Sequence, residues 1–133
     1  MITFRYKYQL AGEKKVGRPV AEVLIKTSEN EWVHFRPYID SGADITLIPL
    51  SIGKILGFQI SDNGVKSLGG IRGSIPVVYK NVRMRIGSRE FPCEVAWALI
   101  EDVPPLLGRK DVFDSFEITF KQSEGLIIFE ERT

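Results

Sequence analysis

Short apolar segments with period-two alternation recur along this chain, and this pattern constrains the fold more than any other feature. The segments are rich in β-branched and aromatic residues, and turn-forming residues such as Gly, Asn and Ser separate them. Many short strands at this spacing are typical of a β-barrel or a β-sandwich. The pattern predicts strands over residues 2–10, 20–27, 32–39, 45–48, 65–68, 75–79, 82–86, 91–99, 116–120 and 126–130.

Helical segments are few. Pro49 suits a first helical position and opens a predicted short turn that runs to Leu56 and ends at Gly57. A second short helix is predicted over residues 109–114. The length of 133 residues fits one domain, and no repeat, low-complexity tract or long linker divides it. We therefore expect a single, all-β domain over residues 1–133.

The composition narrows the class of protein. With 44% hydrophobic and 26% charged residues, the chain can bury a core and does not read as a disordered segment. Eighteen basic and seventeen acidic residues nearly cancel and form no basic stripe, so no nucleic-acid partner is expected. The apolar runs are too short for a membrane span, and the N-terminal segment lacks the pattern of a signal peptide. The single cysteine, Cys93, cannot form an internal disulfide, which favours a reducing, cytoplasmic location.

One carboxylate stands out in the stretch YIDSGADITLIP. Asp40 lies between apolar segments and is followed at once by Ser41 and Gly42. Asp-Ser-Gly alone is common in surface turns. Here the flanking chain is apolar, which indicates a turn lying against the core, and a buried carboxylate is costly unless it is hydrogen-bonded or functional.

Three segments in order carry a resemblance to a known family. Asp40-Ser41-Gly42-Ala43, with apolar chain on both sides, resembles the active-site loop of the retroviral-type aspartic proteases, the retropepsins. SLGGIRGSI, residues 67–75, resembles the glycine-rich flap of that family. PPLLGRKDVF, residues 104–113, resembles the family's apolar-apolar-Gly-Arg segment that leads into its helix. Together the matched segments extend over residues 40–120.

The resemblance implies a fold and a catalytic residue. The fold would be a closed, acid-protease-type β-barrel with one short helix near the C-terminal part, and Asp40 would be catalytic. Acid–base cleavage of an amide needs one group that takes a proton and another that gives one, and two adjacent carboxylates can share one proton for this purpose. The sequence has no second Asp-Ser/Thr-Gly. A two-fold homodimer would supply the second carboxylate, because symmetric contacts are self-pairing.

The same resemblance gives roles to the residues around Asp40. Ser41 would hydrogen-bond across the dimer axis, and Gly42 would expose its backbone to substrate. Asp44 would pair with Arg109, in a geometry that can be bidentate. The alternatives are a simple turn hydroxyl at Ser41 and two unrelated surface charges at Asp44 and Arg109. Leu107 and Gly108 would support the loop from behind, or would simply end a buried strand.

The flap residues would be Gly69, Gly70, Ile71 and Gly73. Three glycines within five residues weaken a plain strand but suit a hairpin tip that opens, closes and lets backbone contact a ligand. Ile71 would point at substrate or at the partner flap. Arg72 stands where viral flaps usually have a small residue. The alternative is an ordinary mobile loop.

The expected function is an aspartic endopeptidase that cleaves extended peptides between apolar side chains, without cofactor or metal. His34, the only histidine, has no Cys or Glu partner at metal-ligand spacing. Two rivals stay open, because a fold does not fix a function. One is a non-catalytic dimerisation or peptide-binding module with the same fold. The other is a structural β-barrel that carries a chance Asp-Ser-Gly.

Overall fold

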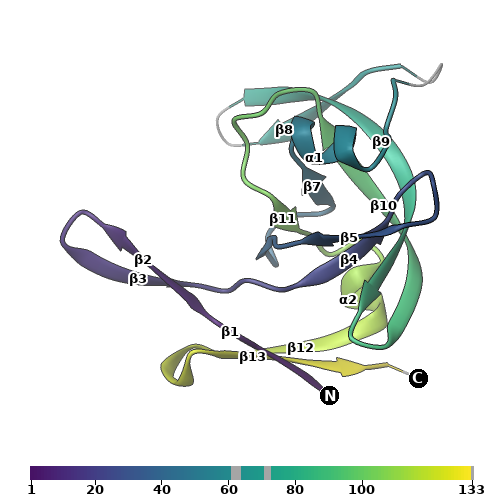
Figure 1. The fold of residues 1–133 in the computed structure, drawn as a ribbon. Helices are drawn as coiled ribbons and strands as arrows, with labels where there is room; N and C mark the ends of the chain where they lie inside the picture. Colours follow the sequence, from purple (N-terminus) through teal and green to yellow (C-terminus); the bar gives the residue numbers. More distant parts are fainter. Residues whose placement is uncertain (61–63, 71–72, 133) are drawn as a thin grey trace.

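The computed structural model describes residues 1–60, 64–70 and 73–132. It consists mostly of β-strands, with two short α-helices and one 3-10 helix in the described part (Figure 1). No helix in these ranges is both long and apolar enough to cross a membrane. In chain order the elements are β1 (Ile2–Arg5), β2 (Lys7–Ala11), β3 (Lys14–Arg18), β4 (Val23–Lys26), β5 (Trp32–Phe35), β6 (Tyr38–Ile39), β7 (Thr46–Ile48), α1 (Leu50–Ile55), β8 (Lys66–Gly70), β9 (Gly73–Ile86), β10 (Arg89–Ala98), β11 (Leu106–Leu107), α2 (Val112–Ser115), β12 (Phe116–Lys121), η1 (Gln122–Glu124) and β13 (Leu126–Glu131).

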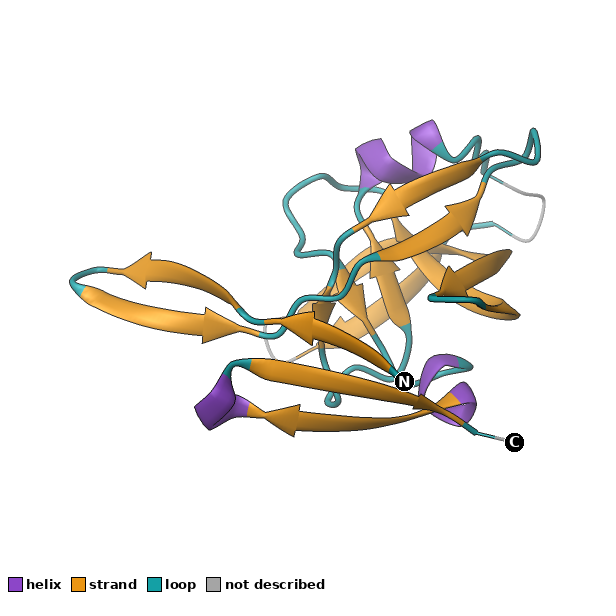
Figure 2. Cartoon of the chain, turned by 60° about the horizontal axis from the view of Figure 1, so that its bottom comes forward, coloured by secondary structure: helices purple, strands orange, loops and turns teal. Residues whose placement is uncertain are grey.

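The main sheet has eight strands in the order β5-β4-β9-β10-β7-β11-β6, with β8 paired on β9. The sheet is strongly curled (Figure 2). Its buried apolar side chains, which include Ile25, Met84 and Val95, form the core. The chain of pairings ends at β5 and β6, so a closed barrel is not confirmed among the described residues. What the structure has is a curled half-barrel.

The strand predictions were right in type and less accurate in extent. The predicted strands 75–79 and 82–86 are one continuous strand, β9. Lys80 and Asn81 do not interrupt it, because they keep their antiparallel register against Val95 and Glu94 of β10. Pairing with a long neighbouring strand thus carries the strand through two polar residues that the sequence prediction left between two strands.

A change between parallel and antiparallel pairing near the β6 end of the sheet positions the chain around Asp40. β10 pairs with β7 in parallel, and β11 pairs with β6 in parallel while it also contacts β7 in the antiparallel sense. The end of β6 therefore lies beside β11, although more than 60 residues separate Asp40 from Leu106 along the chain. This topology brings the Asp-Ser-Gly loop against the Leu-Leu-Gly-Arg segment.

A second sheet, in the order β1-β13-β12, covers one end of the half-barrel. Edge-to-face aromatic contacts link this sheet to the main one: within it the ring of Phe129 lies 5.2 Å from Phe4 and 5.5 Å from Phe116, and Phe116 lies 6.0 Å from Phe91 of β10 in the main sheet. Phe116 and Phe129 are fully buried. The aromatic side chains therefore fix the terminal segments on the body that carries Asp40.

The N-terminal region differs from the prediction. Residues 2–10 were predicted as one strand, but the chain changes partner at Tyr6, whose backbone N–H donates to the carbonyl oxygen of Gly125. β1 pairs with β13, whereas β2 pairs with β3. β3 was not predicted, because KKVGR shows no apolar alternation. The β2–β3 hairpin forms a two-stranded sheet of its own, which extends away from the body (Figures 1 and 2).

Both predicted helices are present and short. α1 follows Pro49, which is its N-cap residue rather than its first helical residue. It packs tightly on the sheet, since a Cβ at Gly53 would lie 2.0 Å from the indole Nε1 of Trp97. α2 begins later than the helix predicted over residues 109–114. Asp111 has a left-handed backbone conformation, so the helix starts only at Val112. The expectation of one short helix in the fold is therefore corrected to two α-helices in the described residues.

Candidate active site

Asp40 occupies the first position after β6 and is held by its backbone and side chain together. Its N–H donates to the carbonyl oxygen of Leu107 at 3.0 Å, and its carbonyl oxygen accepts from the N–H of Ala43 at 3.1 Å. Its Oδ1 accepts from the N–H of Gly42 at 2.9 Å. Ile39 and Ile45, at the two ends of this turn, are buried, while Ser41 and Gly42 are exposed. The core thus holds both stems of the loop and leaves its tip on the surface.

Gly108 supports the loop from behind. A Cβ at this position would lie 2.3 Å from the carbonyl carbon of Ile45, so only glycine lets the two backbones approach this closely. The N–H of Gly108 donates to the hydroxyl oxygen of Thr46 at 3.1 Å. Thr46 is fully buried and was missed by the sequence reasoning. Its signal was a hydroxyl inside the apolar run ITLIP, where an unpaired polar group would be costly.

Arg109 contacts the loop through two different groups. Its Nη1 donates to the carbonyl oxygen of Ser41 at 2.8 Å, and its Nη2 forms an ion pair with Oδ1 of Asp44. The predicted contact with Asp44 is thus present, but it is not bidentate. One guanidinium nitrogen contacts the carboxylate, and the other donates to the Ser41 carbonyl oxygen. Two backbone bonds run alongside, from Arg109 N–H to Ala43 and from Lys110 N–H to Asp44.

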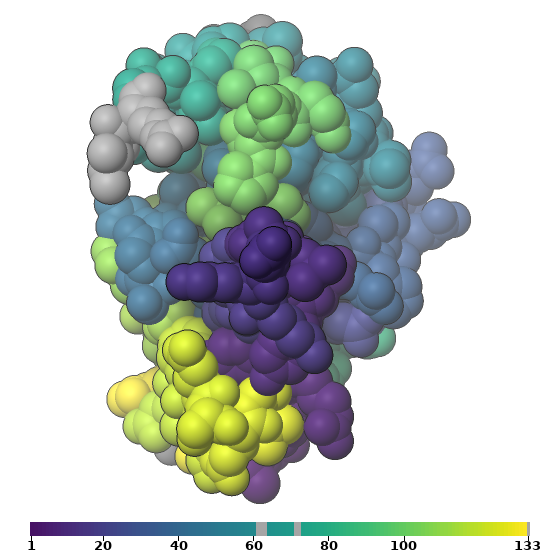
Figure 3. All heavy atoms as spheres, turned by 90° about the vertical axis from the view of Figure 1, so that its left-hand side faces the viewer, coloured from purple at the N-terminus to yellow at the C-terminus, as the bar shows by residue number. Residues whose placement is uncertain are grey.

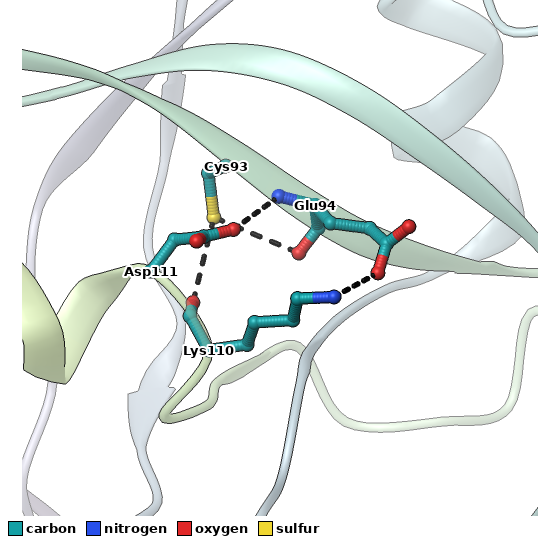
Figure 4. Close-up of polar contacts among 4 residues, drawn as sticks. All are labelled: Cys93, Glu94, Lys110 and Asp111. Carbon is teal, nitrogen blue, oxygen red and sulfur yellow. Dashed lines mark hydrogen bonds and ion pairs between the residues drawn. The ribbon is translucent and has the colours of Figure 1, made fainter.

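A polar cluster fixes the segment after Arg109 to β10 (Figure 4). Oδ2 of Asp111 accepts from the backbone N–H of Glu94 at 2.8 Å, and Nζ of Lys110 contacts Oε1 of Glu94 at 2.6 Å. Cys93 lies behind this pair and is buried, and burial raises the pKa of its thiol to about 12. The hydrogen bond to Glu94 raises the pKa of the Lys110 ammonium. The thiol therefore stays protonated near neutral pH and is not a nucleophile.

An apolar cavity of about 400 Å³ lies between the Asp-Ser-Gly loop and the hairpin formed by β8 and the start of β9. The backbone of Gly42 and Ala43 lies on one side of it, and Leu68, Ile75 and Leu106 contribute apolar walls. Gly69, Gly70 and Gly73 also line it, and Gly73 has a positive φ of 108°. Of the predicted flap residues, Ile71, like its neighbour Arg72, lies outside the described residues.

A second cavity, also of about 400 Å³, contains Asp40 itself. Its walls include Gln9 and Arg18 of the β2–β3 hairpin, Tyr38, and Pro104 and Leu106, the last two shared with the cavity under the β8–β9 hairpin. Gln9 Nε2 donates to the hydroxyl oxygen of Tyr38 at 3.1 Å. Sequence reasoning gave no role to Gln9 or Arg18. Two larger hollows, of about 760 and 700 Å³, include neither Asp40 nor the β8–β9 hairpin.

No group of three or more His, Cys, Asp or Glu side chains in the described ranges is placed to hold a metal ion. His34 lies in the middle of β5 with its side chain exposed. Trp97 is buried, and its Nε1 donates to the carbonyl oxygen of Leu50 at 3.1 Å, which is a packing role. The candidate site therefore consists of Asp40, of Arg109 with its contacts to Ser41 and Asp44, and of the two neighbouring cavities of about 400 Å³.

Solved structures share this fold. The EIAV protease in complex with the inhibitor HBY-793 superposes with a TM-score of 0.56 at 21% identity, over 80% of this chain and 92% of that one. A retropepsin-like aspartic protease from Rickettsia conorii superposes with a TM-score of 0.61 at 18% identity, over 84% and 88% of the two chains. A scan against protein-family models finds no match, and a search of curated proteins finds none.

These superpositions cover most of both chains, so the chain has the fold of the retroviral-type, retropepsin-like aspartic proteases. At 18–21% identity the likeness defines the fold and does not by itself define an activity. The resemblance first seen in three short segments is therefore confirmed at the level of architecture.

Proposed function

We propose that this protein is an aspartic endopeptidase that works as a homodimer, with one Asp40 from each chain in a shared site. The observation that supports this most directly is the placement of Asp40. It lies on a loop fastened by β11 and Arg109, beside an apolar cavity roofed by a glycine-rich hairpin. A fold shared with two proteases of this type adds to that support.

The proposed chemistry needs two carboxylates. Side by side they share one proton, because both cannot be ionised at that distance. The ionised carboxylate takes a proton from a water molecule as that water attacks the peptide carbonyl carbon, and the protonated one gives its proton to the carbonyl oxygen. The tetrahedral species then collapses, and the C–N bond breaks as the leaving nitrogen is protonated. One chain contributes a single Asp-Ser-Gly, so the second carboxylate comes from a second copy.

The substrate proposed is an extended peptide. The β8–β9 hairpin offers backbone groups at Gly69 and Gly70, and main-chain hydrogen bonds to such an edge bind peptides with little regard to sequence. The apolar walls formed by Leu68, Ile75 and Leu106 favour apolar side chains beside the cleaved bond. Ser41, exposed at the loop tip, keeps its proposed role of hydrogen bonding across the dimer axis.

Cleavage of a peptide library by the wild type and by Asp40→Asn tests this proposal. We expect the wild type to cleave next to apolar residues and the variant to bind the same peptides without cleaving them, because the amide cannot act as an acid–base group. Asp114→Asn is the matched control: Asp114 also precedes a serine and is exposed. Cleavage that survives Asp40→Asn would refute the proposal. Peptide binding by a wild type that never cleaves would favour the binding module instead.

A further inference from the structure

We propose that the β2–β3 hairpin, residues 7–18, is an arm that docks on the body of a second copy of this chain, next to the shared site. This inference rests on the proposed function, since it takes from it that a second copy must bring its own Asp40 alongside. It goes further by assigning a part of the interface to the β2–β3 hairpin, which was not predicted from the sequence.

The hairpin has little support of its own. It pairs with no other strand in the described structure and leaves the body as a separate two-stranded sheet. Figure 3, which looks at the molecule from the side of the hairpin, shows it as the dark purple atoms standing in front of the body. A lone two-stranded hairpin is marginally stable in water. A surface that covers one of its faces would make it persist.

The two faces of the hairpin differ. Gln9 and Val16 are cross-strand partners, and both are half-buried. Tyr8 and Leu10 point to the opposite face, because side chains alternate along a strand. They are 52% and 78% exposed. On this face the Tyr8 hydroxyl lies against its own chain, since a Cβ at Gly125 would lie 2.6 Å from it, and Leu10 is the more exposed apolar side chain.

Charge favours a second copy as the occupant. The hairpin carries four basic residues and only one acidic residue, Glu13, which gives it a net charge of +3. The whole chain has a net charge of +1, so the remainder of the chain carries −2. Two hairpins would therefore repel each other, whereas a hairpin and the body of a partner attract. The basic residues are Lys7, Lys14, Lys15 and Arg18.

The root of the hairpin lies at the site. Gln9 and Arg18 line the same cavity as Asp40, and Gln9 is hydrogen-bonded to Tyr38, two residues before Asp40. The partner's body must come close to this cavity if two Asp40 carboxylates are to share a proton. Five-residue strands extend about 17 Å at the usual rise of a β-strand, so the hairpin reaches well beyond its root and onto that body.

Thiol labelling tests the arm. Leu10→Cys places a thiol on its exposed face, while the native Cys93 thiol is buried, with a pKa of about 12, and reacts slowly. Ile55→Cys is the matched control, because Ile55 is 65% exposed and lies on α1. Maleimide labelling is followed from dilute protein to concentrations at which sedimentation shows the dimer. We expect labelling of Leu10→Cys to slow by about fivefold or more as the dimer forms, since docked groups lose water contact, and labelling of Ile55→Cys to stay constant.

A second variant tests how much the hairpin contributes to the free energy of dimerisation. Leu10→Glu puts a charge on the docking face, and we expect the dimer dissociation constant to rise about tenfold, or 1.4 kcal/mol, while Ile55→Glu changes it less than about twofold. Cleavage at protein concentrations that restore the dimer should return to the wild-type rate.

The outcomes separate the two claims. If the wild type dimerises and cleaves peptides but Leu10 is neither protected nor sensitive to substitution, the arm inference fails and the proposed function stands. If labelling of Leu10→Cys slows only when peptide is added, and not when the protein concentration rises, the hairpin binds substrate and the inference is overturned. A wild type that stays monomeric and inactive at every concentration would overturn both.

Discussion

The guanidinium of Arg109 joins two residues of the Asp-Ser-Gly loop region: Nη1 donates to the Ser41 carbonyl oxygen at 2.8 Å while Nη2 pairs with the Asp44 carboxylate. Both contacts lie at exposed positions, but one acceptor is a side-chain carboxylate and the other is the backbone. The Asp44 side chain is 87% exposed and that of Arg109 is 49% exposed, so water screens the ion pair. The bond to the Ser41 carbonyl instead fixes the backbone directly after Asp40. Arg109 therefore positions the loop more than it stabilises the fold.

The two contacts of Arg109 predict different effects for substitutions at Asp44 and at Arg109. Asp44→Asn should lower the free energy of unfolding by less than about 1 kcal/mol, as for other exposed ion pairs. Arg109→Ala should cost little more in stability but should lower kcat by about tenfold or more, because the Asp40 carboxylate loses its alignment when the backbone that follows it at Ser41 is no longer tethered. Urea melts and peptide cleavage measure the two quantities. A loss of about 3–5 kcal/mol for Asp44→Asn would instead indicate a buried pair.

Gly108→Ala tests the close approach behind the loop. The added Cβ would lie 2.3 Å from the carbonyl carbon of Ile45, which is backbone and cannot rotate away. We expect a loss of about 1–3 kcal/mol in the free energy of unfolding, as for overpacked cores. Gly69→Ala is the control, since among the described residues no atom apart from those of its chain neighbours lies within 4 Å of a Cβ there. Equal stability of the two variants in thermal or urea unfolding would contradict this packing.

The alternation of apolar and polar residues predicted those parts of the fold that depend on neighbouring residues in the chain. Alternation located most strands, and the apolar flanks of Asp40 correctly indicated a turn lying against the core. It did not reveal that β9 continues through Lys80 and Asn81, because only the paired β10 holds those residues in register. The division of the N-terminal strand at Tyr6 depends on the carbonyl of Gly125, more than 100 residues away. Long-range pairings of this kind leave no period in a single sequence.

The candidate site follows the same rule. Asp40, Asp44 and Arg109 were identified from the three matched segments, and the structure brings them together. Thr46 and Gln9 were missed because their roles exist only in three dimensions: one accepts from Gly108, and the other donates to Tyr38. The second carboxylate that the proposed function requires would come from another copy of the chain, because this sequence has a single Asp-Ser-Gly.

Cys93 gives a prediction for alkaline pH. Burial raises its pKa from 9.0 to about 12, so between those values the unfolded chain loses the thiol proton while the folded chain keeps it. Stability from this group is therefore complete below about pH 9 and falls as pH rises toward 12, at up to about 1.4 kcal/mol per pH unit. Cys93→Ala should be less stable at pH 8 because of the cavity it creates, but should lose less further stability between pH 9 and 11. Parallel slopes of stability against pH for the two proteins would contradict the assignment.

The shared-proton mechanism predicts a cleavage rate that depends on pH. Coupled carboxylates titrate as a pair, so kcat/KM should rise and fall with two apparent pKa values that belong to the dimer. The measurement uses one peptide across the acidic and neutral range, with sedimentation at each pH to confirm that the dimer persists. A rate that stays flat from about pH 3 to pH 8 would rule out a carboxylate pair as the acid–base group.

Subunit mixing tests the central claim most directly. Asp40→Asn keeps the size of the side chain and can still accept the hydrogen bond from Gly42, so the variant should fold and dimerise. Wild type and variant are mixed at varied ratios, and mass tags on the two chains establish that subunits have exchanged. Mixed dimers hold one carboxylate and one amide and lack the acid–base pair. If pairing is random, activity per total chain follows the square of the wild-type fraction and falls to about a quarter at equal mixing. A linear dependence, with half the activity at equal mixing, would show that each chain holds a complete site and would contradict the account.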